Sequence, residues 1–155
     1  MSFFGKKLTF KYKKEFDSKL SREIYYPAID IILKWEDNQF ETTAIIDSGS
    51  DMLFISEEVA DTLNLKLGKE ETADVLGGGN INVRTSNLNL ILVRGKNRID
   101  LGIIPVSVGM GIKGKESSMD IVIGRNPVFD KLKIIFEQYK KIITIEKFDL
   151  KWRKY

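Results

Sequence analysis

The sequence predicts an all-β protein, mainly strands with one or two short helices, arranged as a closed or partly closed β-barrel. Short apolar segments rich in Ile, Val, Phe and Tyr recur at even spacing, and turn residues separate them. This pattern is typical of barrels built from short strands. The 155 residues are enough for one domain with its own core, and no repeat or linker divides them.

Each expected strand is bounded by glycine, proline or a cluster of polar residues. Pro27 is expected at the start of the paired part of its strand, where a missing N–H is tolerated. Two arms around the glycines at 77–79 are expected to form a hairpin, and so are the last two strands. The expected strands cover residues 8–16, 24–35, 40–46, two arms within 73–83, 87–93, 99–108, 120–123, 133–136 and 141–147.

Two short helical segments interrupt the strands. Residues 56–65 are expected to form a helix in which Ser56 is the N-cap and Glu57 and Glu58 lie at the positive end of the helix dipole. Residues 127–132 are expected to form one or two helical turns, with Pro127 near the first position.

The chain contains no cysteine and no histidine, which excludes several kinds of site. Disulfides, thiolate nucleophiles and zinc–thiolate centres need cysteine, whereas Ser-His catalysis and most other zinc sites need histidine. Acid–base chemistry near neutral pH must therefore use carboxylates, Lys or Tyr. We expect no metal and no cofactor.

Charge and hydropathy narrow the expected partners. The formal net charge is +3, but acids and bases interleave along the chain, so nucleic acid is not an expected partner. No apolar run approaches the roughly 18 residues of a membrane span, and the N-terminus lacks the apolar core of a signal peptide. A cytoplasmic protein without membrane contact is expected.

Two apolar segments that end in glycine-containing turns are the most informative feature. Ile45 and Ile46 lead into residues 47–50, Asp-Ser-Gly-Ser, and residues 121–126 read Ile-Val-Ile-Gly-Arg-Asn. An apolar strand that runs into such a turn fixes a carboxylate at the strand end. Taken alone, the Asp-Ser-Gly tripeptide is common, and its simplest interpretation is a β-turn or an Asx-turn.

Four elements in this order resemble the retropepsin-type aspartic proteases, the single-domain, homodimeric relatives of pepsin that include retroviral proteases. Residues 47–50 match the catalytic turn of that family, and residues 76–80 fall where it has a glycine-rich flap. Residues 121–126 match its apolar-apolar-Gly-Arg-[Asn/Asp] segment, and Asp51 matches an acid that pairs with that Arg. The resemblance spans roughly residues 24–145.

The resemblance implies a retropepsin-like acid-protease β-barrel, one lobe per chain, and an aspartic endopeptidase that binds its peptide substrate in extended form. It implies that Asp47 holds the attacking water, that Gly49 offers its N–H to the carboxylate and that the Ser48 hydroxyl links two turns across a dimer axis. The implied catalytic residues are Asp47, Ser48 and Gly49, the substrate-binding residues are Ser50, Leu76, Gly77, Gly78, Gly79 and Asn80, and the structural pair is Asp51 with Arg125.

Two expectations concern hydrogen bonds around this turn. The Ser50 hydroxyl is expected to donate to the ionised Asp47 carboxylate. Asp51 and Arg125 are expected to form a buried bidentate ion pair beneath the turn, which would tie it to the segment that follows Gly124.

The chemistry of an aspartic protease requires two carboxylates, because one aspartate cannot both hold a proton for the substrate carbonyl and deprotonate a water. Two carboxylates about 3 Å apart share one proton. The chain contains one Asp-Ser-Gly or Asp-Thr-Gly, because Lys19 follows Asp17-Ser18 and Leu63 follows Asp61-Thr62. A second Asp47 must then come from a second subunit, which predicts a two-fold symmetric homodimer.

The expected organisation has three parts: residues 1–23 as an N-terminal extension with the first strand, residues 24–147 as the protease domain, and residues 148–155 as a charged tail. The extension before the first matching strand, and the hairpin after the Gly-Arg segment, depart from the retroviral pattern.

Other functions stay open at this point. A catalytically silent module of the same fold would bind peptides or dimerise without cleavage, although the intact Asp-Ser-Gly argues against it. Residues 109–116 nearly match a phosphate-binding loop, but Glu116 replaces the Ser or Thr that binds magnesium, and no helix is expected to follow. Residues 147–155 mix basic and aromatic side chains, as single-strand nucleic-acid binders do.

Overall fold

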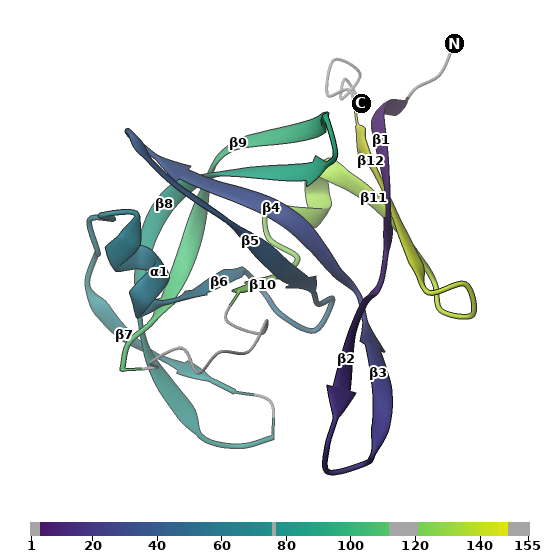
Figure 1. Cartoon of the computed structure of the whole chain (residues 1–155). Coiled ribbons are helices and arrows are strands. Elements are labelled where there is room, and N and C mark those ends of the chain that lie inside the picture. Colours follow the sequence, from purple (N-terminus) through teal and green to yellow (C-terminus); the bar gives the residue numbers. More distant parts are fainter. Residues whose placement is uncertain (1–3, 76, 112–120, 149–155) are drawn as a thin grey trace.

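The computed structural model describes residues 4–75, 77–111 and 121–148 (Figure 1). Two short helices are present in this part of the chain: α1 (Glu57–Thr62) and the 3₁₀ helix η1 (Phe129–Lys131). The strands are β1 (Phe4–Lys11), β2 (Lys13–Asp17), β3 (Arg22–Tyr26), β4 (Ala28–Trp35), β5 (Asn38–Ile46), β6 (Leu53–Ser56), β7 (Glu70–Asp74), β8 (Asn80–Arg94), β9 (Asn97–Gly109), β10 (Ile121–Ile123), β11 (Leu132–Glu137) and β12 (Ile142–Phe148).

Six strands form a closed barrel. They follow the order β4-β5-β10-β6-β9-β8, and β8 returns to pair with β4 through registers such as Ile31↔Leu92. Closure leaves the barrel wall without a free edge, and β7 adds to β8 outside the closed ring. The prediction of an all-β, closed barrel is confirmed.

Alternation along the strands builds the core. On β4, Ile29, Ile31 and Leu33 are fully buried, and β8 contributes Leu88, Leu90 and Leu92 in the same two-residue period. Each such side chain contributes about 1.5–3 kcal/mol by leaving water. The packed core of these strands fixes the position of the barrel wall from which the loop after β5 extends.

A second sheet, ordered β1-β12-β11, packs against the barrel. Leu8 and Phe10 of β1 and Ile143 and Ile145 of β12 belong to the same buried cluster as the barrel residues. The N-terminal strand is thus tied into the core through its pairing with β12, seen at the right of Figure 1.

Two predicted strands are each divided in the structure. Residues 8–16 span β1 and β2, which are separated at Tyr12, where the backbone N–H donates instead to the Lys141 carbonyl (2.8 Å). Residues 24–35 span β3 and β4, which are separated at Pro27 because proline has no N–H for a ladder. Conversely, the second flap arm and residues 87–93 belong to one continuous strand, β8.

The helices are shorter than expected. Ser56 does cap α1, since its hydroxyl accepts from the Val59 N–H at 3.4 Å, but the helix ends at Thr62 and Asn64 adopts a left-handed φ of 54°. After Gly124 there is a single 3₁₀ turn, η1, and Pro127 precedes it instead of starting it. No helix in the described residues is long and apolar enough to span a membrane.

Candidate active site

Asp47 lies where β5 ends, held by a strand from the far part of the chain. β10 pairs with β5 in parallel, with Val122 opposite Ile45 and Ile123 opposite Ile46. The Asp47 N–H continues this ladder by donating to the Ile123 carbonyl at 3.0 Å. The position of the Asp47 backbone is therefore set by the barrel wall, while its side chain is exposed.

The turn after Asp47 orients the carboxylate. The Gly49 N–H donates to Asp47 Oδ1 at 2.8 Å, and the Ser50 N–H donates to the Asp47 carbonyl at 3.2 Å. Asp47, Ser48 and Gly49 are all exposed, so the carboxylate is open to water and to a partner molecule. The arrangement supplies one oriented carboxylate per chain and leaves one carboxylate oxygen for other partners.

Gly124 packs directly against the backbone of the loop that follows Asp47. It belongs to the sequence motif at residues 121–126, but the motif did not reveal this contact. A Cβ at this position would lie 2.5 Å from the Met52 carbonyl oxygen, 2.6 Å from that of Ser50 and 2.7 Å from the Met52 nitrogen. The next two residues bind the same loop, because the Arg125 N–H donates to Ser50 O (2.9 Å) and the Asn126 N–H to Asp51 O (2.6 Å). Only glycine permits this close passage.

Asp51 and Arg125 do meet, but their pair is exposed. The Arg125 guanidinium donates to Asp51 Oδ1, and the side chains of Arg125 and Asp51 remain 52% and 77% accessible, respectively. The expectation of a buried pair is therefore wrong for the single chain: the loop is short and lies on the barrel surface, so nothing covers the two side chains. The backbone bonds of Arg125 and Asn126 fix the turn independently of this ion pair.

The exposure of Asp51 and Arg125 predicts that their ion pair contributes little to the free energy of unfolding. Arg125→Ala, Asp51→Ala and the double variant should each lower the free energy of unfolding by no more than about 1 kcal/mol, since exposed ion pairs contribute little. The coupling in the double-mutant cycle, measured from urea midpoints, should be equally small. A loss of about 3 kcal/mol or more from Arg125→Ala would contradict this, and would show that the pair is buried in the assembled protein.

The Ser50 hydroxyl does not donate to Asp47 in the single chain, contrary to expectation. It donates to the Met52 carbonyl at 3.2 Å, because the loop curls toward Gly124 and brings that carbonyl within reach. Ser50 is half-buried and acts within its own loop, whereas Ser48 is exposed to solvent.

The glycine hairpin has the predicted place in the chain and projects from the barrel at the lower left of Figure 1. β7 pairs with the first residues of β8, ending with Asp74 opposite Asn80. Gly77, Gly78 and Gly79 all have positive φ, between 95° and 99°, which glycine tolerates best. The Val75 N–H closes the tip by donating to the Gly79 carbonyl at 3.1 Å. Leu76, the remaining predicted flap residue, lies outside the described residues.

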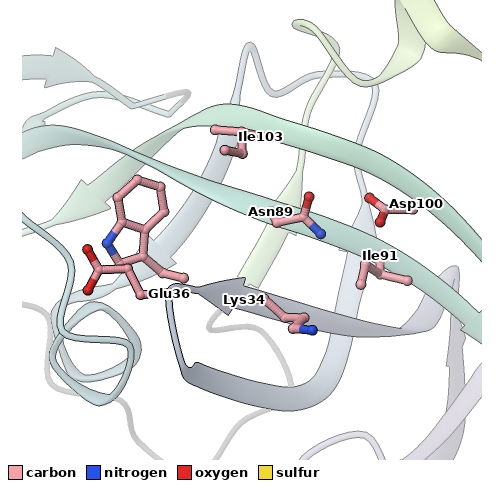
Figure 2. Close-up of a pocket in the computed structure, with 7 residues that line it drawn as sticks. Lys34, Glu36, Asn89, Ile91, Asp100 and Ile103 are labelled. Carbon is pink, nitrogen blue, oxygen red and sulfur yellow. The ribbon is translucent and has the colours of Figure 1, made fainter.

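A separate surface groove of about 440 Å³ lies at the other end of the β4–β5 hairpin (Figure 2). Trp35 pairs with Asn38 there, whereas Ala28 pairs with Ile45 at the Asp47 end. Its polar rim is mixed in charge, and it contains none of the predicted site residues. The lining residues are Lys34, Trp35, Glu36, Asn89, Ile91, Asp100 and Ile103. This groove is distinct from the Asp47 turn.

No cluster of three or more acidic residues that would hold a metal ion occurs among residues 4–75, 77–111 and 121–148. The glycine-rich segment at 109–116 begins at the end of β9, where Gly111 N–H donates to Glu57 Oε2 at 2.9 Å. Its residues 112–116 lie outside the described part, as do residues 149–155 of the charged tail.

Comparison with known proteins identifies the family of the chain. The sequence model of the family described as Aspartyl protease matches residues 33–126, which include the Asp47 turn, the glycine hairpin and the Gly-Arg segment. No curated protein sequence matches the chain.

A solved structure shares the fold at low identity. The chain is similar to a retropepsin-like aspartic protease from Rickettsia conorii (14% identity, TM-score 0.52, covering 92% of this chain and 91% of that one). It is also similar to the EIAV protease bound to an inhibitor (17% identity, TM-score 0.39, 68% and 86% covered). A Legionella pneumophila protein of unknown function gives 15% identity and a TM-score of 0.36, with 68% and 86% covered. The family match over the site and the closed barrel together show that this chain belongs to the aspartyl protease family, with a retropepsin-like fold.

Proposed function

We propose that the protein is an aspartic endopeptidase whose active site combines Asp47 of two subunits. The observation that carries this proposal is the exposed Asp47 carboxylate, held at the end of a barrel strand by the Gly49 N–H (2.8 Å) in a turn supported by Gly124. A single chain supplies one such carboxylate. A two-fold axis beside the turn would bring a second, identical carboxylate within reach of the first.

In the proposed reaction the two carboxylates share one proton and hold a water between them. The ionised carboxylate takes a proton from the water as its oxygen attacks the peptide carbonyl carbon, and the protonated carboxylate transfers its proton to the carbonyl oxygen. The resulting gem-diol collapses when the carboxylate that took the proton of the water passes it to the amide nitrogen, the C–N bond breaks, and a gem-diol hydroxyl returns its proton to the other carboxylate. The products are a carboxylic acid and an amine, and the dyad returns to its singly protonated form.

The substrate would bind as an extended strand between the Asp47 turn and the β7–β8 hairpin. Gly77, Gly78 and Gly79 are exposed, and the backbone groups of the tip other than the Gly78 N–H and the Gly79 carbonyl, which bond to Val75, would be available for main-chain hydrogen bonds. Val75, beside the tip, is 43% exposed and offers an apolar contact. The Ser48 hydroxyl, exposed in the single chain, would bond across the dimer axis to the opposite turn.

Dilution tests the two-subunit site. The assay is cleavage of a denatured generic substrate that a statine-type inhibitor blocks. The specific activity of the protein is expected to fall as its concentration is lowered through the dimer dissociation constant. Sedimentation equilibrium at the same concentrations gives the dimer fraction, and activity should follow that fraction. A monomer with full, statine-sensitive activity would refute the shared dyad, and a dimer with no cleavage would instead indicate a silent peptide-binding or dimerisation module.

A further inference from the structure

The hairpin formed by β2 and β3 is an isolated arm outside the barrel. Its strands pair with each other in a separate two-stranded sheet, from Lys13↔Tyr26 to Asp17↔Arg22, and Figure 1 shows it extending downward from the barrel. A two-stranded hairpin on its own is at best marginally stable in water. The arm also precedes residues 33–126, the part of the chain that the family model matches.

The root of the arm is fixed next to Asp47. Pro27, which joins the arm to β4, accepts a hydrogen bond from the Ile46 N–H at 2.9 Å, and Ile46 immediately precedes Asp47. Lys13 bridges to Asp30 of β4 at 2.8 Å. Lys141 lies 5.8 Å from the centroid of the Tyr25 ring, so the β11–β12 turn braces the same root. The arm therefore begins at a defined place beside the catalytic turn.

The arm carries large apolar side chains in contact with water. Phe16 is 68% exposed and Tyr25 39% exposed, and the pairing of Phe16 with Glu23 and of Lys14 with Tyr25 places both on one face. Leu20, at the tip, is 56% exposed. On the same face Lys14 bonds to Glu23 at 3.0 Å, and this hydrogen bond and charge lower the pKa of the Glu23 carboxyl. The arm is thus an ordered ribbon that exposes Phe16 and part of Tyr25 beside the Lys14–Glu23 ion pair.

We propose that this arm packs on the second copy of the chain and helps to hold the dimer in which the two Asp47 side chains meet. The inference rests on the proposed function, which sets the two-fold axis beside Asp47 with the carboxylates about 3 Å apart. A hairpin rooted at Ile46 then begins close to the axis. Its strands of 5 residues extend roughly 17 Å at about 3.4 Å per residue, far enough to pass onto the partner subunit. Exposed aromatic side chains are typical anchors of such interfaces.

The first test removes the apolar side chains of the arm. In the double variant Phe16→Ser with Leu20→Ser, the dimer dissociation constant from sedimentation equilibrium should rise at least about tenfold. The matched control is Ile103→Ser, which removes an apolar side chain of similar exposure (66%) from β9 at the distant groove and should leave dimerisation unchanged. At concentrations high enough to saturate the dimer, both variants should cleave substrate with the kcat of the wild type.

The second test uses the natural absence of cysteine. Leu20→Cys, labelled with a benzophenone maleimide and irradiated, should give a covalent dimer, whereas the equally labelled Ile103→Cys should stay monomeric on a denaturing gel. Both tests report on association, so they are independent of catalysis. If wild-type dimers are inert yet depend on Phe16 and Leu20, the arm is supported and the proposed activity fails. If active dimers form equally well without these side chains, or if only KM changes, the arm does not hold the dimer.

Discussion

Asp47→Asn is expected to lower kcat/KM for peptide cleavage by about 10²–10⁴-fold, because the asparagine amide can neither ionise nor share a proton with the opposite carboxylate. Asparagine keeps the size of the side chain and an oxygen that can accept the Gly49 N–H, so the turn should persist. Sedimentation equilibrium and the urea midpoint of the variant should therefore match those of the wild type. The assay is hydrolysis of a denatured protein substrate with and without a statine-type inhibitor.

Asp61→Asn is the matched control for this variant. Asp61 is an exposed aspartate that also precedes a hydroxyl residue, Thr62, but Leu63 replaces the glycine of the turn. It lies on α1 and should be dispensable for cleavage. Comparable rates for Asp47→Asn and the wild type would remove Asp47 from the mechanism, whatever the oligomeric state.

Gly124→Ala should have the largest effect on stability, lowering the free energy of unfolding by about 3 kcal/mol, near the upper end of what overpacking costs. The added methyl group would lie 2.5–2.7 Å from three backbone atoms of Ser50 and Met52. A flexible side chain could move aside, but the backbone of a hydrogen-bonded loop can do so only by displacing the Asp47 turn. Activity should therefore fall together with the urea midpoint.

The comparison variant for Gly124 is Gly95→Ala, in the β8–β9 turn. Gly95 has a φ of 60°, and a methyl group added there would meet no atom within 4 Å beyond its chain neighbours. This change therefore costs only the left-handed backbone strain, about 1–2 kcal/mol, and should leave activity intact. If Gly124→Ala keeps both the wild-type midpoint and full activity, the segment behind the turn is not the support that its geometry indicates.

Alternating apolar residues predicted the barrel strands, and residue chemistry predicted the Ser56 cap. Pairing partners were harder to predict. Residues 8–16 and 24–35 have the composition of two long strands. Pro27 was correctly expected where the paired part of the second one begins, but only the structure shows that Tyr12 divides the first and that the pieces between form a separate arm. Strand periodicity shows which face is apolar, but it does not show which neighbour pairs with it.

The sequence predicted some contacts of the candidate site, such as those of Gly49 with Asp47 and of Arg125 with Asp51, but not the surroundings of these residues. The contact between Asp51 and Arg125 follows from a motif, whereas their exposure depends on what covers the loop, which no local pattern encodes. The sequence offered the Asp47 carboxylate as an acceptor for the Ser50 hydroxyl, but the path of the loop toward Gly124 brings the Met52 carbonyl to it instead. Glycine is required at position 124 because its backbone lies against that of Ser50 and Met52, a segment distant in the chain.

The parallel pairing of β5 with β10 has a consequence for biosynthesis. Ile46 is synthesised early and Ile123, which pairs with it, is synthesised late. The pairing of β5 with β10 that positions Asp47 therefore joins segments far apart in the chain and must form late in folding. A nascent chain on the ribosome would carry the aspartate long before it carries the strand and the glycine that shape its turn. The proposed peptidase would therefore remain inactive throughout most of its own translation, and would gain its half-site only when nearly all of the barrel has emerged.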